Sequence, residues 1–274
     1  MTGSPVETTQ ATSILEPVQP VRPPAPYVGG KRNLAGELAR RIASVPHGTY
    51  AEPFVGLGGV FFRRDHRPKS EVINDISADV VTLFRILQRH YQSFLGELKW
   101  RLYSRAEFDR LMATDPVTLT DLERAARFLY LQRSAFGGKV VGRSFAMTRG
   151  SPARFDLTKL EPMLADVHER LARVTIEQLP YAEFIRRYDG PATLFYLDPP
   201  YWGSEGYYGP TFSRGDFEAL RRALEASQAR FILSINDTPE IRHIFAGFDI
   251  EEAHHSFRLS GRPTEARELI ISRQ

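Results

Sequence analysis

The chain has 274 residues with a formal net charge of +3, and 42% of them are hydrophobic, enough to bury the core of one large domain or of one domain with an insert. It contains no cysteine, which excludes disulfides and thiolate metal sites and fits a reducing compartment. No apolar run approaches the ~18 residues of a membrane span, and residues 1–20 lack the basic start and the apolar stretch of a signal peptide.

The first third of the chain predicts a tail followed by alternating helix and strand. Residues 1–24 are rich in Thr, Pro, Ser and Val without periodicity, which predicts a disordered tail. Residues 34–44 have the apolar spacing of a short amphipathic helix. Residues 49–54 predict a strand that runs into a glycine cluster, and 71–74 predict a second strand that ends at Asp75.

A helical block follows in the middle of the chain. From Ala78 to Trp100 apolar residues recur at helical spacing, and further helices follow Ser104 and begin near Thr120, where Glu123 completes a capping-box pattern. Strand-like runs return only later, at 173–179, 192–197, 230–235, 248–257 and 265–272. We therefore predict an α/β fold, a Rossmann-like, doubly wound sheet with an inserted helical domain at roughly 80–170.

Asp198-Pro199-Pro200-Tyr201 directly follows the apolar run 194–197, which predicts a buried parallel strand. Ligands of open α/β sheets bind at the carboxyl ends of such strands. The two prolines have fixed φ angles and no backbone N–H, so the turn is stiff and its carbonyls are left to accept hydrogen bonds. A carboxylate, a free carbonyl and an aromatic ring together suit a planar group that carries an NH2.

Two glycine clusters precede this motif. YVGGK, residues 27–31, places a lysine beside a tight turn, where it could face a ligand carboxylate or lie on the surface. EPFVGLGG, residues 52–59, predicts a strand-to-helix turn whose glycines let the backbone approach a ligand. Asp75 lies about 20 residues further on, where an acid commonly accepts from ribose hydroxyls. This pairing indicates a nucleoside-containing cofactor; the alternative is a packing turn and a helix-capping aspartate.

Residues 124–154 carry seven basic side chains and no acidic one. Aromatic residues are interleaved with them, and glycines make the middle of the span loop-like. Such one-sided charge indicates a face that contacts phosphates, and the alternative is an ordinary solvated surface. The basic residues are Arg124, Arg127, Arg133, Lys139, Arg143, Arg149 and Arg154.

The segment after Tyr201, WGSEGYYGPTFSRGDF, combines glycine and proline with large aromatic residues, Tyr207 among them. So much aromatic surface in a loop indicates a lid or a base-stacking element. The alternative is a loop packed on its own aromatic cluster. His254 and His255 fall on a predicted strand without the spacing of metal ligands, so no metal site is expected.

The chain resembles the Dam-type, alpha-class (D12) DNA adenine-N6 methyltransferases in four motifs that occur in the order of that family. These motifs are YVGGK, EPFVGLGG, Asn74-Asp75-Ile76 and DPPY. The resemblance covers roughly residues 24–273. The stretch FLYLQRSAFGGK departs from the NR…NG pattern of the GATC-specific members and is more similar to phage or prophage relatives, so the resemblance does not imply a target sequence.

The resemblance implies a methyltransferase sheet formed by 25–79 and 171–274, with 80–170 as a helical insert for DNA target recognition. It further implies S-adenosyl-L-methionine as cofactor and double-stranded DNA as substrate, in the cytoplasm of a bacterium or a phage-infected cell. The catalytic motif would be Asp198, Pro199, Pro200 and Tyr201. The cofactor would contact Tyr27, Gly29, Gly30, Lys31, Glu52, Pro53, Phe54, Gly56, Gly58, Asp75, Ile76 and Asp198. Expected DNA contacts are Arg133, Phe136, Lys139, Arg143, Arg149 and Tyr207.

Within this set, Tyr27 and Lys31 would hold the methionine end of the cofactor, and Asp75 its ribose. The implied reaction methylates the N6 amine of an adenine flipped out of the duplex. Cytosine-N4 methylation uses the same amine chemistry and stays open, as do RNA methylation and an inactive DNA-binding relative. A nicotinamide-dependent oxidoreductase is disfavoured because Phe61 stands where the dinucleotide fingerprint needs glycine.

Overall fold

A computed structural model of the protein describes residues 15–27, 31, 33–147, 149–150, 152–203, 212–259 and 262–273; for 254–259 and 262–266 it describes the backbone alone. Gly29, Gly30 and Tyr207, which belong to the predicted cofactor and DNA sites, lie outside the described residues. Within the described ranges, none of the helices combines the length and the apolar character that crossing a bilayer requires.

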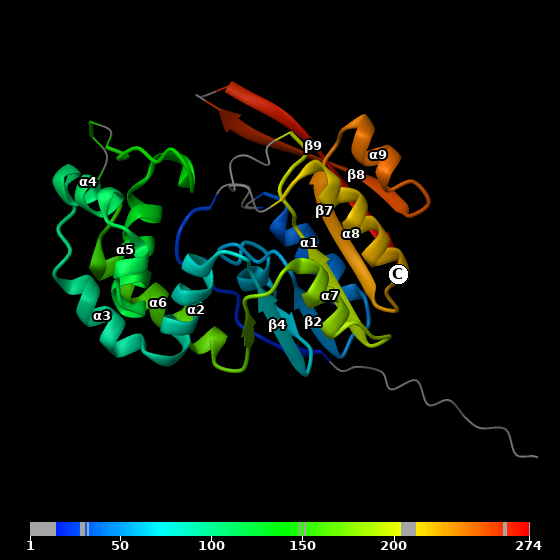
Figure 1. Ribbon diagram of the computed structural model, residues 1–274, viewed down its shortest axis with the longest axis horizontal. Coiled ribbons are helices and arrows are strands. Elements are labelled where there is room, and N and C mark those ends of the chain that lie inside the picture. The colour runs from blue at the N-terminus through cyan, green and yellow to red at the C-terminus, as the bar shows by residue number, and fades with distance from the viewer. Residues whose placement is uncertain are drawn as a thin grey trace, which may run out of the picture.

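The protein is built on a mixed seven-stranded sheet with the order β5-β4-β2-β6-β7-β9-β8 (Figure 1). The first five of these run parallel, and β9 and β8 complete one edge as antiparallel strands. The predicted doubly wound α/β sheet is thereby confirmed. The strands are β2 (Thr49–Glu52), β4 (Ser70–Asn74), β5 (Thr175–Glu177), β6 (Thr193–Leu197), β7 (Arg230–Asn236), β8 (Asp249–Leu259) and β9 (Arg262–Arg273).

The central strands are apolar on both faces because helices cover both. Along β6, Leu194 and Tyr196 join one core cluster, whereas Phe195 and Leu197 join the other, as the two-residue period of a strand requires. The first cluster includes α1 (Ala35–Ser44). The second packs against α7, α8 and α9, of which α7 and α8 lie in front of the strands in Figure 1. Their bounds are Tyr181–Tyr188, Arg214–Ala226 and Pro239–Ile244.

A block of helices lies to one side of the sheet (Figure 1, left). The predicted helix over 78–100 is divided at His90, whose φ of −131° is not helical, so that two helices pack separately against α5 and α6. The predicted capping box of Thr120 and Glu123 is present at the start of α5. The helices are α2 (Ala78–Arg89), α3 (Tyr91–Lys99), α4 (Arg105–Ala113), α5 (Asp121–Ser134) and α6 (Leu157–Leu171), with short 3₁₀ turns η1 (Phe61–Arg63), η2 (Pro116–Thr118) and η3 (Phe136–Gly138).

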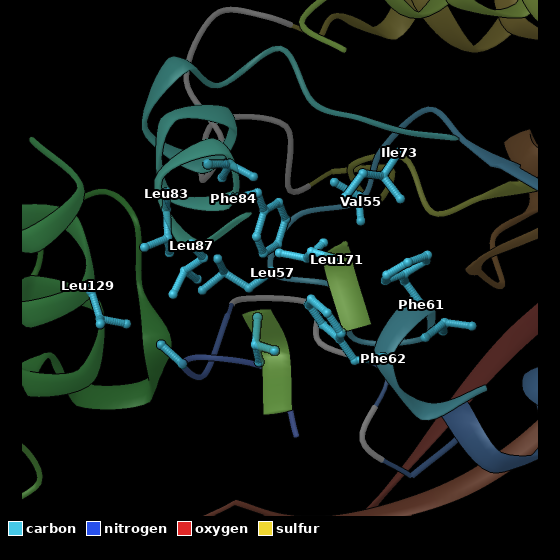
Figure 2. Packing of buried hydrophobic residues seen from close by; sticks show 14 of the residues in the cluster. Val55, Leu57, Phe61, Phe62, Ile73, Leu83, Phe84, Leu87, Leu129 and Leu171 are labelled. Atoms are coloured by element: carbon cyan, nitrogen blue, oxygen red, sulfur yellow. The ribbon is translucent and has the colours of Figure 1, made fainter. Parts of the chain in front are cut away.

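The hydrophobic core continues from the sheet into the helical block without interruption. Figure 2 shows side chains of the glycine turn and η1 beside those of α2, α5 and α6. All of them belong to one buried cluster. The expected boundaries of the insert, 80 and 170, stay predictions, because this shared core offers no linker at which to divide the chain. The labelled residues are Val55, Leu57, Phe61, Phe62, Ile73, Leu83, Phe84, Leu87, Leu129 and Leu171.

The prediction of a disordered tail over 1–24 is wrong for residues 15–24. Strand β1 (Glu16–Pro17) pairs antiparallel with β3 (His66–Arg67), and the Val21 N–H donates to the Phe62 carbonyl at 2.8 Å. Proline-rich sequence without periodicity is compatible with an extended backbone that pairs along an edge, which composition alone does not distinguish from disorder. Residues 1–14 lie outside the described residues.

Candidate active site

A cavity of about 1240 Å³ opens at the carboxyl edge of the sheet. Glu52 ends β2, Asp75 follows β4 and Asp198 follows β6, and all three side chains line it. The strand order reverses between β2 and β6, and open α/β sheets bind ligands at such a switch point. Of the other predicted residues, the cavity wall includes Tyr27, Lys31, Pro53, Phe54, Gly56, Ile76, Arg133 and Pro200.

Three of the predicted catalytic and cofactor residues that the structure describes do not line the cavity. Pro199 is buried within the DPPY turn, and Tyr201 contacts Lys31, which does line the cavity. Gly58 is required by packing: its φ is 74°, and a Cβ there would lie 2.3 Å from the ring of Phe62.

The glycine turn is fixed by the aspartate that the sequence pairs with it. Asp75 Oδ2 accepts from the Gly56 N–H at 2.9 Å, and Oδ1 accepts from the Ser77 N–H at 2.8 Å. Gly56 has a φ of 51°, and a Cβ there would lie 3.1 Å from the ring of Tyr27. Gly56 thus lets Tyr27 approach the turn, and Asp75 connects the ends of two neighbouring strands.

Asp75 retains the capacity to accept further hydrogen bonds. A carboxylate offers about four acceptor sites, and the two backbone N–H groups above use part of them. Burial raises the pKa of Asp75 to about 6 although the surrounding N–H groups lower it. A ligand that brings hydroxyl donors would favour the ionised form, which is the chemistry that a ribose provides.

Glu52 lies at the floor of the cavity and is 2% exposed. The hydroxyl of Tyr50 donates to its Oε2 at 2.6 Å. Burial raises the pKa of Glu52 to about 8, and the nearby carboxylates of Asp198 and Asp75 act in the same direction. A cationic ligand above Glu52 would counter this cost by pairing with the carboxylate.

Lys31 forms ion pairs with both the DPPY turn and β9, the last strand of the chain. Its buried ammonium lies 3.0 Å from Asp198 Oδ1 and 2.9 Å from Glu268 Oε2, and it donates to the hydroxyl of Tyr201. The Tyr201 hydroxyl in turn donates to Glu268 Oε1. These four residues, Lys31, Asp198, Tyr201 and Glu268, are called the lysine cluster below. Lys31 was expected at the methionine end of the cofactor, and it pairs with Asp198 and donates to Tyr201, two residues of the DPPY turn.

Glu268 is the member of this cluster that the sequence did not single out. It lies on β9 opposite Asn236 of β7, immediately before the buried run 269–271. An acidic residue directly before the buried apolar run on β9 is the signal that could have identified it, since a buried carboxylate needs a partner. The partner, Lys31, is 237 positions away in the sequence, so no local pattern indicates that the two residues form a pair.

The DPPY turn is also held by a residue of β7. The side chain of Asn236 accepts from the Trp202 N–H at 2.9 Å and donates to the Trp202 carbonyl at 3.1 Å. Burial raises the pKa of Asp198 to about 6, and the Lys31 ammonium opposes that rise. Asp198 is therefore an aspartate of unusual basicity on a turn fixed on both sides.

Three aromatic rings form one wall of the cavity. The Phe54 ring lies 5.5 Å from that of Tyr181 and 5.9 Å from that of Phe212, and all three residues line the cavity. The Tyr181 hydroxyl donates to Asp216 Oδ1 at 2.9 Å, which ties this wall to the start of α8. Phe54 was expected at the cofactor, and Phe212 belongs to the aromatic segment expected as a lid or base-stacking element. Nothing local in the sequence marks Tyr181 or Asp216 as neighbours of the glycine turn.

The predicted DNA-contact residues within the basic span 124–154 include both exposed and partly buried side chains. Phe136, Lys139 and Arg149 are exposed, as a DNA-contacting surface requires. Arg133 instead donates to the Pro24 carbonyl at 2.8 Å, and Arg143 donates to Gln132 Oε1 at 3.0 Å and to the Lys139 carbonyl at 3.1 Å. Burial lowers the pKa of both arginines. Their predicted DNA contacts stay predictions. Arg143 also links the loop after α5 to the end of that helix, whereas Arg133 holds the segment that precedes Tyr27.

The strand-end carboxylates, the glycine turn and the DPPY turn meet at one cavity of an α/β protein. The chain belongs to the D12 class N6 adenine-specific DNA methyltransferases, whose family model matches residues 27–258. The N6 amine of adenine is thus the target, and the cytosine-N4 alternative is set aside. The resemblance of the four motifs to this family is confirmed.

Two relatives illustrate the family. The chain is 23% identical over 276 residues to the type II methyltransferase M1.LlaDCHI of Lactococcus lactis subsp. cremoris, covering 92% of this chain and 95% of the relative. It is 26% identical over 246 residues to the DNA N-6-adenine-methyltransferase of Escherichia phage P1, covering 82% of this chain but only 31% of that longer protein. A solved ribosomal protein L11 methylase from Lactobacillus delbrueckii subsp. bulgaricus aligns with a TM-score of 0.38 and 13% identity over 94% of this chain and 91% of that chain.

Proposed function

We propose that the protein transfers a methyl group from S-adenosyl-L-methionine to the N6 amine of an adenine flipped out of duplex DNA. The observation that carries this proposal is that Asp198, on the DPPY turn, lines the same cavity as Asp75 and the glycine turn. An acceptor for an amine and a site for a nucleoside cofactor therefore share one space. Reaction between two bound partners requires such proximity.

The cavity fits the character of this cofactor, which is a cation with ribose hydroxyls and an adenine ring. Asp75 has acceptor sites for the hydroxyls, Glu52 offers a carboxylate to the positive charge, and Phe54 offers a ring face. Tyr27, packed on the glycine turn, would contact the methionine end. When bound, S-adenosyl-L-methionine supplies an electrophilic methyl group and keeps the electron pair of the broken carbon–sulfur bond.

The chain's own residues account for activation of the amine. Adenine N6 is a poor nucleophile because its lone pair is delocalised into the ring. Hydrogen bonds from the amine to Asp198 and to the Pro199 carbonyl would favour a pyramidal nitrogen whose localised lone pair forms the new N–C bond. One of the two amine protons leaves in this step, and Asp198, with a pKa raised to about 6, accepts it. Tyr201 would stack on the base.

An adenine inside a duplex cannot reach this turn, so the base must be flipped at a cost of roughly a few kcal/mol. Phosphate contacts from the loop that follows α5 would offset that cost. Lys139 and Arg149 are exposed there, and Phe136 is 59% exposed beside them in the sequence. We assign the DNA-facing role first to these three residues.

The test is incubation of the purified protein with labelled S-adenosyl-L-methionine and duplex DNA, followed by digestion to nucleosides. We expect label in N6-methyl-2′-deoxyadenosine and none in N4-methyl-2′-deoxycytidine. The matched control is Asp198→Asn, which keeps the shape of the side chain but removes the acceptor charge, and which should lower the rate by ~100-fold or more. Preferred methylation of RNA over duplex DNA, or binding of NADH in place of S-adenosyl-L-methionine, would contradict the proposal.

The biological role that we propose is modification of DNA in a restriction–modification system, in the cytoplasm of a bacterium or a phage-infected cell. A type II methyltransferase among the relatives supports this role. Single-molecule sequencing of DNA from cells that express the protein would give the modified base and its sequence context together. A short, fully methylated recognition sequence is the expected result, and scattered methylation without a common sequence would argue against protection of a restriction site.

A further inference from the structure

One ammonium stands between two carboxylates at the catalytic turn. Lys31 Nζ lies 3.0 Å from Asp198 and 2.9 Å from Glu268, and the side chains of Lys31 and Glu268 are 1% and 6% exposed. Amine activation as described above uses Asp198 and leaves Glu268 without a part in the chemistry. Burial of a second carboxylate costs free energy, which its ion pair with Lys31 offsets. That pair accounts for the burial of Glu268 but not for its place beside Asp198.

Glu268 contacts two members of the lysine cluster at once. Its Oε2 accepts from Lys31 and its Oε1 accepts from the hydroxyl of Tyr201, whose ring lies 4.3 Å from the Lys31 ammonium. A tyrosine held at its hydroxyl has the long axis of its ring fixed in place. A lysine that also pairs with a second carboxylate interacts less strongly with the first. Glu268 therefore restrains both neighbours of Asp198 from the far side.

We propose that Glu268 is a positioning residue of the methyl transfer, which holds Lys31 and Tyr201 so that Asp198 keeps its strength as a hydrogen-bond and proton acceptor. This inference rests on the proposed function of the cavity. Without Glu268, the ammonium would pair with Asp198 alone and compete with the substrate amine for its oxygens. The ring of Tyr201, on which the base would stack, would lose the contact that fixes its position.

The same arrangement predicts a pH signature. The groups that face Asp198 are Lys31, Glu268 and, across the cavity floor, Glu52 and the Tyr196 hydroxyl. The negative charge of Glu268 raises the pKa of Asp198, and the Lys31 ammonium lowers it. Asp198 must be ionised to accept, so the methylation rate falls as the pH drops through the pKa of Asp198. This fall in rate is the acid limb of the pH profile. Removal of the Glu268 charge should move the acid limb to lower pH.

The test uses Glu268→Gln in the full chain, with Glu251→Gln as the matched control because Glu251 lies on the neighbouring strand β8 and pairs with Arg41 at the surface. Single-turnover methylation of duplex DNA is measured against pH, together with the Kd for S-adenosyl-L-methionine and for DNA. We expect Glu268→Gln to lower the plateau rate by about tenfold or more. Both Kd values should stay within about twofold, and the acid limb should shift to lower pH. The control should behave as the wild type.

An unchanged rate in Glu268→Gln, or a lower rate with the acid limb in its wild-type position, would overturn the inference. If Glu268→Gln does not fold, Glu268→Asp decides. Glu268→Asp keeps the negative charge, but its side chain is shorter by one methylene. It should therefore keep the acid limb at the wild-type pH while the methylation rate falls. A wild-type rate in this variant would contradict the inference. A wild-type protein that methylates no DNA would instead defeat the proposed function.

Discussion

Carboxyl groups at the strand ends make the unliganded protein less stable as the pH rises. Glu52 has a pKa of about 8 in the folded protein and an ordinary value of 4.5 in an unfolded chain. Between these values the folded state retains a proton that the unfolded state has released, so the free energy of unfolding falls as the pH increases. Asp75 and Asp198, with pKa values of about 6, add the same trend between about pH 4 and pH 6.

Glu52→Gln should therefore stabilise the protein without ligand. The amide can still accept from the Tyr50 hydroxyl but cannot ionise, so the free energy of unfolding at pH 8.5 should rise by about 1–3 kcal/mol, with little change at pH 5. Urea unfolding at the two pH values measures this. The same variant should bind S-adenosyl-L-methionine more weakly at pH 8.5, where the wild-type carboxylate is ionised. Equal stability of the two proteins at pH 8.5 would refute the assigned pKa.

Asp75→Asn addresses the ribose site directly. The neutral amide keeps one acceptor oxygen, so the Gly56 turn retains part of its support, but charged hydrogen bonds to ribose hydroxyls are lost. Such bonds contribute roughly 1.5–3 kcal/mol, which predicts a 10- to 100-fold weaker Kd for S-adenosyl-L-methionine by calorimetry. DNA affinity measured without cofactor should stay within about twofold. A cofactor affinity equal to that of the wild type would remove Asp75 from the site.

At the level of elements, local signals predicted most of the architecture. The five later strands, the first helix and the capping box of α5 follow from periodicity and caps, because these patterns are written in neighbouring residues. The features that could not be predicted depend on contacts between residues far apart in the sequence. They are the edge strand β1, the break at His90 between two helices that pack on α5 and α6, and the Lys31–Glu268 pair. The same holds for the cavity. Its glycine turn and acids were marked by spacing, and Phe54 and Phe212 of its aromatic wall lie in predicted segments, whereas Tyr181 was not predicted.

The loop after α5 should contribute nonspecific DNA affinity through its exposed cations. Lys139→Ala/Arg149→Ala removes two exposed charges. It spares Arg143, which supports the loop, and Arg133, which binds the Pro24 carbonyl. If both are phosphate contacts, the slope of log K against log[salt] should shrink by about 2 for every duplex sequence tested. Affinity for S-adenosyl-L-methionine should be unchanged. An unaltered salt slope would show that the span is only a solvated surface.

At the scale of the molecule, a buried ionic cluster joins the helical block to the sheet. Arg170 of α6 donates to both oxygens of Glu71 on β4, each at 2.7 Å, and Arg64 after η1 donates to the same carboxylate. All three side chains are at most 4% exposed. The guanidinium of Arg64 also lies 3.6 Å from the centre of the Tyr50 ring, and Tyr50 holds Glu52. The cavity floor and the helical block are thus supported by one set of contacts.

Because Glu71 is the only carboxylate hydrogen-bonded to these two buried cations among the described residues, its loss should affect both parts of the fold. Breaking a buried ion pair from one side typically costs about 3–5 kcal/mol, since the remaining charge is left uncompensated. Glu71→Gln should lower the free energy of unfolding by that amount in urea, and amides of α6 and β4 should lose protection from hydrogen exchange together. The matched control is Glu225→Gln, which removes the exposed pair with Arg221 on α8 and should cost less than about 1 kcal/mol. Loss of protection confined to β4, with α6 unchanged, would mean that the helical block is held to the sheet by its apolar core alone.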